Sequence, residues 1–171
     1  LRRFDLSVEE AKAQQRALAD RVVLAPPPGF APRLVAGLDV SMERFGTVGY
    51  AGAVVLRVPE LETVDEAATA APLTFPYVPG LLSFRELPLI VGVWDRLATK
   101  PDVLIFDGQG YAHPRRFGIA CHGGVLFGVP SIGCAKSILV GRHAPLAPER
   151  GSRAPLEHRG EVVGTAIRLR D

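Results

Sequence analysis

The residues of this chain most able to do chemistry lie in one stretch, residues 103–116, with the sequence VLIFDGQGYAHPRR. Its first four residues are apolar and are bounded by a Lys-Pro-Asp turn and by a glycine, which is typical of a short buried strand. That strand ends on Asp107. A carboxylate at the end of a buried strand is poorly solvated unless a cation meets it, so we expect a metal ion or a basic side chain beside Asp107.

Two further acids are candidates to share that cation. Asp39 is the one charge in the apolar run LVAGLDVS, and Glu86 follows the segment PYVPGLLSFR. Magnesium takes a few carboxylates together with water and phosphate oxygens, so three acids from separate elements predict a hard-cation site. Alternation along a strand places Asp39 on the face of Val35 and Gly37, which it can share with a neighbouring strand ending at Asp107.

Each acid also has a purely structural alternative. Asp39 could bond nearby backbone, and Glu86 could close a capping box with Ser83. The alternative for Glu86 is disfavoured because Pro88 would then be the fifth residue of the helix, where proline deletes a backbone hydrogen bond. We therefore expect the helix to begin later and to leave the Glu86 carboxylate free in the entry turn.

Basic and aromatic residues accompany these acids. Lys136 directly follows the apolar segment SIGCA, where its ammonium could aim at a phosphate or remain solvated. His113, taken alone, is more typical of a satisfied histidine than of a catalyst. Prolines at positions 76 and 79 pin the backbone around Tyr77 and Val78, and such a rigid tip has the form of a wedge inserted between bases. A loop packed on the core is the structural alternative.

Composition limits the class of protein. The chain has 171 residues, 47% hydrophobic and 22% charged, as expected for one globular domain. Its apolar runs are too short for a bilayer and its first residues carry no secretory pattern, so we expect a soluble, cytoplasmic monomer. Cys121 and Cys134 show no metal or disulfide spacing, and we expect both in the core. A net charge of +2 and a pI near 8.8, with arginine far above lysine, permit a nucleic-acid partner without requiring one.

Periodicity predicts an α/β fold. A helix over residues 8–22 begins at a capping box between Ser7 and Glu10 and carries an apolar stripe of Ala11, Leu18 and Val22. Residues 34–41, 49–58 and 61–70 predict an antiparallel meander with the third strand at the edge and a hairpin through MERFGTV. The remaining elements are predicted as a helix over 87–97, a strand over 103–106, a helix over 114–127 opened by Pro114, a strand over 131–135, an irregular segment over 141–160 and a strand over 161–169. Together they form a mixed sheet with helices packed against it.

Four stretches, GLDVS, FPYVPGLLSFRE, PDVLIFDGQGYAHPRRFGIACH and PSIGCAKS, closely resemble the endonuclease V family in their order and separations. The resemblance covers nearly the whole chain from Leu34 onward. It implies a ribonuclease H-like fold, a three-stranded antiparallel meander followed by parallel strands and flanked by helices, in a single domain over residues 1–171. It also implies a Mg²⁺-dependent DNA repair endonuclease, with Mn²⁺ as a substitute. Such an enzyme flips deoxyinosine out of DNA and cuts the second phosphodiester 3′ to it, leaving 3′-hydroxyl and 5′-phosphate ends.

The same resemblance implies a role for individual residues. The implied metal ligands are Asp39, Glu86 and Asp107. Lys136 and His113 match catalytic positions close to the scissile phosphate. The implied DNA wedge is Pro76, Tyr77, Val78 and Pro79. The implied walls of the base pocket are Gly80, Leu82, Gly110, Gly118, Ile119 and Leu139. By their charge, Arg85, Arg115 and Arg116 are candidates for phosphate contacts that position DNA without reading its sequence.

Two departures from the family pattern bear on activity. Position 109 is Gln where relatives often carry His. The chain ends at Asp171 where relatives usually continue through another strand and a His-containing segment, so we expect the family's C-terminal extension to be lacking. The alternative enzyme is an endonuclease for inosine in RNA. The alternative outside enzymes is a lesion-binding module that cuts poorly because its C-terminus is short.

Overall fold

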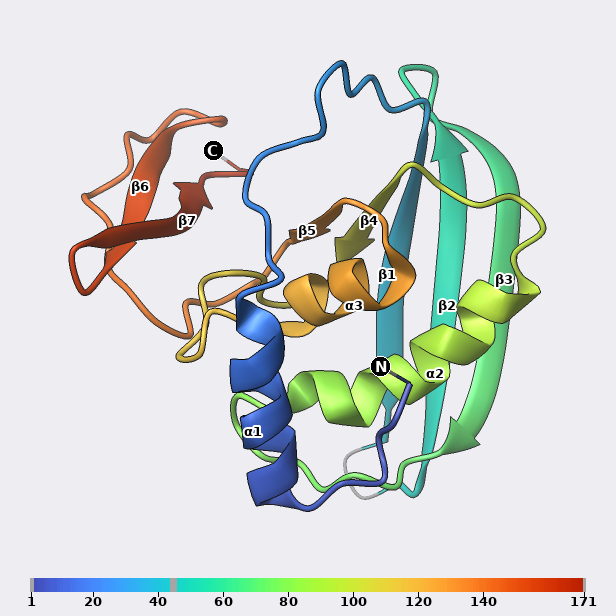
Figure 1. The fold of residues 1–171 in the computed structure, drawn as a ribbon. Coiled ribbons are helices and arrows are strands. Elements are labelled where there is room, and N and C mark those ends of the chain that lie inside the picture. Colours follow the sequence, from blue (N-terminus) through green and yellow to red (C-terminus); the bar gives the residue numbers. More distant parts are fainter. Residues whose placement is uncertain (1, 44–45, 171) are drawn as a thin grey trace.

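The computed structural model describes residues 2–43 and 46–170, and its centre is a five-stranded mixed sheet (Figure 1). The strand order is β3-β2-β1-β4-β5. The strands are β1 (Leu34–Met42), β2 (Val48–Arg57), β3 (Glu62–Pro72), β4 (Val103–Phe106) and β5 (Ser131–Gly133). The first three pair antiparallel, with β3 at the edge, and β4 and β5 run parallel to β1. The predicted meander and mixed sheet are confirmed; residues 44 and 45 of the predicted hairpin turn lie outside the described residues.

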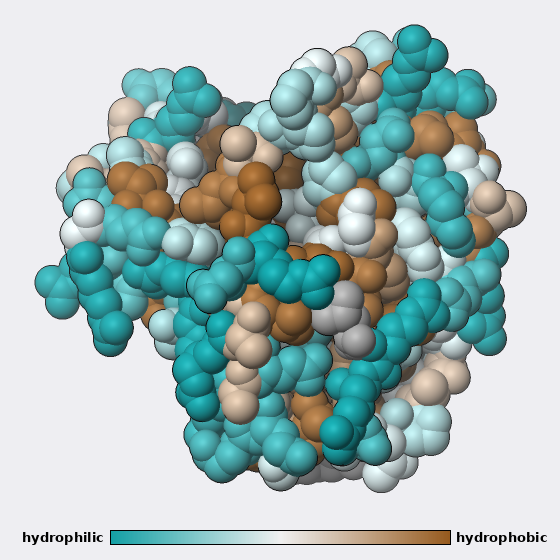
Figure 2. Space-filling view, viewed as in Figure 1, coloured by the Kyte–Doolittle hydropathy of each residue, from teal (hydrophilic) through white to brown (hydrophobic). Residues whose placement is uncertain are grey.

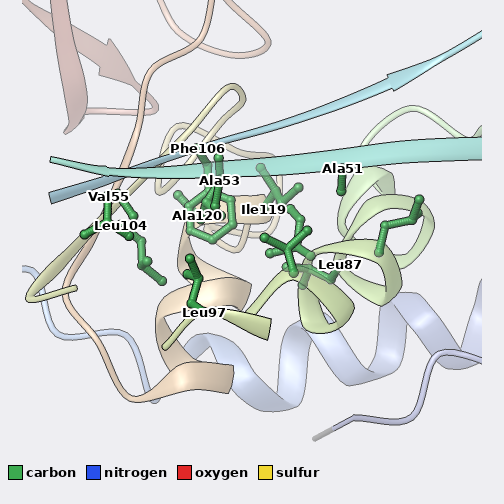
Figure 3. Packing of buried hydrophobic residues seen from close by; sticks show 14 residues of the cluster. Ala51, Ala53, Val55, Leu87, Leu97, Leu104, Phe106, Ile119 and Ala120 are labelled. Carbon is green, nitrogen blue, oxygen red and sulfur yellow. The ribbon is translucent and has the colours of Figure 1, made fainter. Parts of the chain in front are cut away.

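Three helices lie on the buried side of this sheet: the last two pack directly on its strands, and the first packs against the last. They are α1 (Val8–Ala19), α2 (Leu82–Arg96) and α3 (Ile119–Phe127). Burial alternates along β1, where Ala36 and Leu38 face the helices and Gly37 and Asp39 face away. Figure 3 shows the main core between the strands and the helices, where Phe106 of β4 lies among alanines of β2 and apolar residues of α2 and α3. Each large side chain buried there stabilises the fold by about 1.5–3 kcal/mol, and this packing fixes α2 and α3 against the strands that carry the acids.

The predicted start of α2 was wrong. The helix begins at Leu82, five residues earlier than expected, and Pro88 lies inside it. Packing outweighs the lost backbone hydrogen bond, because Phe84, Leu87 and Leu89 are all fully buried. Glu86 therefore lies within the helix and not in an entry turn. The capping-box alternative is also contradicted, since the N-cap is Leu81 without a side-chain cap.

The predicted helix over 114–127 is likewise shorter than expected. Pro114 lies in a turn, Arg116 has a left-handed backbone (φ 55°), and α3 begins only after Gly118. At the N-terminal end, the capping box of α1 is confirmed, with Ser7 Oγ accepting from the Glu10 N–H at 3.2 Å. That helix ends at Ala19 instead of residue 22.

The segment predicted to be irregular contains a strand that was missed, over residues 153–158, whereas the strand predicted over 161–169 is confirmed over 161–167. Strands β6 (Arg153–His158) and β7 (Glu161–Ile167) form a separate antiparallel hairpin, seen to one side of the main sheet in Figure 1. The hairpin docks through Leu156 and Val163 onto Tyr111 and Ala112 of the loop that follows β4. Cys121 is half-buried, but the predicted core position of Cys134 was wrong, because β5 ends at Gly133 and the thiol is exposed.

The surface of the helical side is mixed. Figure 2 shows that hydrophilic residues cover most of its rim, whereas hydrophobic residues gather toward its middle. Within the described residues, no helix is long and apolar enough to cross a membrane.

Candidate active site

Asp39 and Asp107 lie side by side on adjoining parallel strands. Leu38 of β1 pairs with Phe106 of β4, and the Asp107 N–H donates to the Leu38 carbonyl oxygen at 3.3 Å. The two aspartates are the next residues along each strand, where adjacent backbones are about 4.8 Å apart. The Asp39 carboxylate also accepts from the Val40 N–H at 2.9 Å, so the local backbone bond considered as an alternative is present as well.

Glu86 approaches these aspartates from α2. Burial, followed by the negative charges of Asp39 and Asp107, raises the pKa of Glu86 to about 7. Arg85 acts in the opposite direction but does not offset them. The three acids therefore share one electrostatic field, although they come from two strands and a helix.

The cation expected beside Asp107 is Lys136. Its Nζ lies 2.5 Å from Asp107 Oδ2, while 85% of the lysine side chain is exposed. The hydrogen bond and charge of Asp107 raise the pKa of Lys136. A basic side chain thus meets the aspartate, as the sequence predicted.

The donor set fits a hard cation. In the part of the chain that the structure describes, no three His, Cys, Asp or Glu side chains form a ready-made metal cluster. Even so, the acids are all oxygen donors of the type that Mg²⁺ prefers. Burial and, after it, repulsion from Asp39 and Asp107 raise the pKa of Glu86, and a divalent cation between the acids would relieve the repulsion. The residues that could hold it are Asp39, Glu86 and Asp107.

A cavity of about 360 Å³ joins the acids to most of the other predicted site residues. This volume is in the range of small-molecule sites. Its lining includes all three acids, Lys136 and His113. The predicted wedge and pocket residues that also line it are Tyr77, Val78, Pro79, Gly80, Leu82, Gly118, Ile119 and Leu139. Gly110 lies elsewhere: a Cβ built on it would be 3.6 Å from the Gly133 nitrogen.

The segment 76–80 combines the two interpretations offered for it. Tyr77 is 72% exposed, as a wedge requires. Val78 instead packs against the buried cluster that contains Phe75 and Phe84, as a structural loop would. The tip is therefore presented to solvent while its neighbour anchors the segment.

The predicted phosphate-contacting arginines are held by other groups in this structure. Arg85 donates to the Phe75 carbonyl oxygen at 2.5 Å. Arg116 donates from Nε to Glu161 Oε2 at 2.8 Å, which ties the loop after β4 to the β6–β7 hairpin. Arg115 donates from Nη2 to the Gly80 carbonyl oxygen at 2.8 Å. These contacts orient the loops around the cavity, and a DNA-contacting role stays a prediction.

His113 is buried, with 2% of its surface exposed, and its Nε2 lies 2.9 Å from the Gly80 oxygen. Burial lowers the pKa of His113 to about 4, so the ring is neutral at pH 7. Sequence reasoning missed the residue that joins this group from α1, Gln15, which is 1% exposed and lines the same cavity. A signal existed, because Gln15 lies four residues after Ala11 and three before Leu18, on the apolar stripe.

A family model and a curated protein similar to this chain carry the same family description. A family model described as Endonuclease V matches residues 16–171. A curated protein of Myxococcus xanthus named Endonuclease V is 60% identical over 168 residues, which are 98% of this chain and 72% of that protein.

Solved structures agree in fold. A crystal structure of Endonuclease V from Streptomyces avermitilis superposes with a TM-score of 0.86 at 43% identity, covering 96% of this chain and 73% of that one. Ciona intestinalis Endonuclease V, in complex with a 24mer DNA containing an inosine followed by a ribo-adenosine, gives a TM-score of 0.67 at 31% identity, covering 76% and 57%. The expected ribonuclease H-like fold is confirmed.

Proposed function

Because the chain belongs to the endonuclease V family, we propose that it is a Mg²⁺-dependent endonuclease that finds deoxyinosine in DNA. It turns the lesion base out of the duplex and hydrolyses the second phosphodiester bond 3′ to it, leaving 3′-hydroxyl and 5′-phosphate ends. The damaged base stays in the nicked strand for later removal.

The observation that carries the proposal is the convergence of chemistry and recognition on one cavity. Three acids and Lys136 line the same cavity of about 360 Å³ as Tyr77 and Gly80. An enzyme that flips a base out of the duplex needs a pocket for the extruded nucleotide, and here that pocket would adjoin the groups that cut the strand.

The acids would hold the cation and Lys136 would complete the charge balance. Bound Mg²⁺ supplies a water of lowered pKa and stabilises charge on the attacking and leaving oxygens. Asp39, Glu86 and Asp107 offer the carboxylate oxygens, and Glu86 has to lose its proton to do so. Lys136 is mostly exposed and pairs with Asp107, so its ammonium can turn toward a scissile phosphate and stabilise charge there.

The other half of the cavity suits a flipped purine. Extrusion of a base costs a few kcal/mol, and least where pairing is already weak, as for inosine opposite ordinary bases. Tyr77 is exposed at the tip of the segment and can stack in the gap left in the duplex. Gly80, Gly118 and Ile119 line this half of the cavity.

Inosine in RNA is the second candidate substrate. The observation in its favour is the Ciona intestinalis complex, in which a ribo-adenosine follows the inosine. A 2′-hydroxyl is therefore present directly beside the lesion in a relative's ligand. Duplexes that differ only in deoxyribose or ribose at that position separate the two substrates.

A nicking assay tests the proposal. The protein is incubated with Mg²⁺ and matched duplexes, one with a single deoxyinosine and one without, and products are sized at nucleotide resolution. We expect one cut, after the nucleotide that follows the lesion, in the inosine strand only. A gel shift in Ca²⁺ without any nicking in Mg²⁺ would leave a lesion-binding module and overturn the nuclease.

A further inference from the structure

One backbone carbonyl oxygen in the cavity wall, that of Gly80, accepts hydrogen bonds from three side chains. The Gly80 carbonyl accepts from Gln15 Nε2 at 3.0 Å, His113 Nε2 at 2.9 Å and Arg115 Nη2 at 2.8 Å. A carbonyl oxygen has two lone pairs, so three donors saturate it. We call Gln15, Gly80, His113 and Arg115 the Gly80 hub. The hub fixes the C-terminal end of the exposed Tyr77 segment.

Gln15 has no N–H group left to donate to a ligand. Its second Nε2 bond goes to the Phe117 carbonyl oxygen at 3.1 Å, and its Oε1 accepts from Arg115 Nε at 2.5 Å. Both amide hydrogens and the amide oxygen are thus used within the protein. Although Gln15 lines the cavity, its role is to hold other groups in place.

The hub also fixes the tautomer of His113. The Gly80 carbonyl can only accept, so Nε2 carries the proton, and Nδ1 is then free to accept from the Arg115 backbone N–H at 3.2 Å. A neutral ring makes both bonds at once. The histidine, like Gln15, is committed to the hub.

Three separate parts of the chain meet at this point. Gln15 comes from α1, Gly80 ends the wedge segment, and residues 113–117 belong to the loop between β4 and α3. Gly80 has φ +80°, and a Cβ on it would lie 3.0 Å from Arg115 Nη2, so the contact depends on the glycine. The hub therefore sets the distance between the wedge and the loop that forms the opposite wall of the cavity.

We propose that Gln15 is a positioning residue that sets the preference for inosine over undamaged DNA, by locking the wedge segment to the pocket wall through the Gly80 carbonyl. This inference rests on the proposed function. An extruded base is bound tightly only if the wedge and the pocket already have the correct relative position. Each segment that has to become ordered on binding costs conformational entropy and so weakens the complex. Contacts to the DNA backbone do not need that register, so binding to undamaged duplex should be insensitive to Gln15.

Two substitutions probe the amide in different ways. Gln15→Met keeps the length of the side chain but removes all three of its hydrogen bonds. Gln15→Glu keeps an acceptor for Arg115 and places carboxylate oxygens against the Gly80 and Phe117 carbonyls. The matched controls are the same changes at the neighbouring residue, Gln14→Met and Gln14→Glu, where the side chain is only half-buried.

The measurement is the ratio of dissociation constants for undamaged and inosine duplexes in Ca²⁺, with single-turnover nicking in Mg²⁺ and hydrogen exchange of residues 76–81. We expect both Gln15 variants to lower the ratio about tenfold or more, through weaker inosine binding, with binding to undamaged DNA within about twofold of wild type. Exchange at residues 76–81 should accelerate, while the Gln14 controls behave as wild type.

The outcomes separate this proposal from the one on which it rests. If wild type shows no inosine preference, the proposed function itself fails. A wild type that prefers inosine, with Gln15 variants of unchanged ratio, would overturn the positioning role alone. Equal loss on both duplexes, or variants that are unfolded at the assay temperature, would make Gln15 a residue of general stability and would equally overturn it.

Discussion

The two polar groups at the ends of the cavity are built on opposite principles. At one end, Asp39 and Asp107 repel Glu86, and the nearby cations Arg85 and the exposed Lys136 offset that negative charge only in part. At the other end, the Gly80 hub has Gln15 and His113 buried, carries one cation and has both N–H groups and the oxygen of the Gln15 amide bonded within the protein. Unbalanced charge marks the place where a ligand is expected, whereas saturated bonds mark a support that holds its shape. The following changes break or sharpen that contrast.

Asp107→Asn should have the largest effect, because it removes one of the three carboxylates expected to bind the metal ion. We expect nicking of an inosine duplex in Mg²⁺ to fall more than about a hundredfold, while binding in Ca²⁺ remains. The control is Asp95→Asn, an exposed aspartate of α2 that pairs with Arg2. Full nicking by Asp107→Asn would remove this residue from the metal site.

Lys136→Met should be the next most damaging change. The ammonium is expected to stabilise charge at the phosphate, so single-turnover nicking at saturating enzyme should fall by roughly a hundredfold. Affinity for the duplex should change much less. Lys12→Met, which removes a lysine paired with Glu9 on α1, is the control. A loss confined to affinity would make Lys136 a docking residue.

Tyr77→Ala tests whether the exposed tip acts on the lesion. Stacking of a base on an aromatic ring is worth about 1–3 kcal/mol, so we expect inosine binding to weaken about tenfold and undamaged DNA to be little affected. Equal losses on both duplexes would make the tip a structural element. Combined with Gln15→Met, the loss of preference should be less than additive, because both changes act on the same segment.

Glu86→Gln should produce the smallest effect, and it concerns stability. A carboxyl group with a raised pKa binds its proton more tightly in the folded than in the unfolded protein, so its contribution is full below about pH 4.5 and is lost as the pH rises through about 7. Without divalent cations, wild type should therefore melt at a lower temperature at pH 8 than at pH 5.5. The variant should melt roughly 2–4 °C above wild type at pH 8. Identical melting curves for the two proteins would contradict the repulsion among the acids.

The sequence predicted the acidic end of the cavity, with Asp39, Glu86 and Asp107, better than it predicted the Gly80 hub. A lone acid in an apolar run, as at Asp39 and Asp107, is visible because its charge conflicts with the apolar residues around it in the sequence. Gln15 is a neutral side chain on an ordinary helix. The carbonyl groups to which it donates lie 65 and 102 residues away in the sequence, so no local pattern predicts these hydrogen bonds. The meander and β4 were predicted because their periodicity is local.

The errors share a physical cause. The start of α2 was placed too late because Pro88 disfavours a helix locally, while burial of Phe84 and Leu87 decides otherwise. Strand β6 was missed because Pro155 lies within it and because it forms a sheet with strand β7 instead of joining the main sheet. In each case tertiary packing outweighed local propensity.

The account depends most directly on the three acids binding one divalent site. A crystal of the protein soaked in Mn²⁺ and measured at the manganese absorption edge would locate bound metal by its anomalous signal. The account predicts manganese coordinated by carboxylate oxygens of Asp39, Glu86 and Asp107, at roughly 2.0–2.3 Å, with Lys136 turned away from Asp107. Manganese bound elsewhere on the protein, or no signal at these three carboxylates, would contradict it.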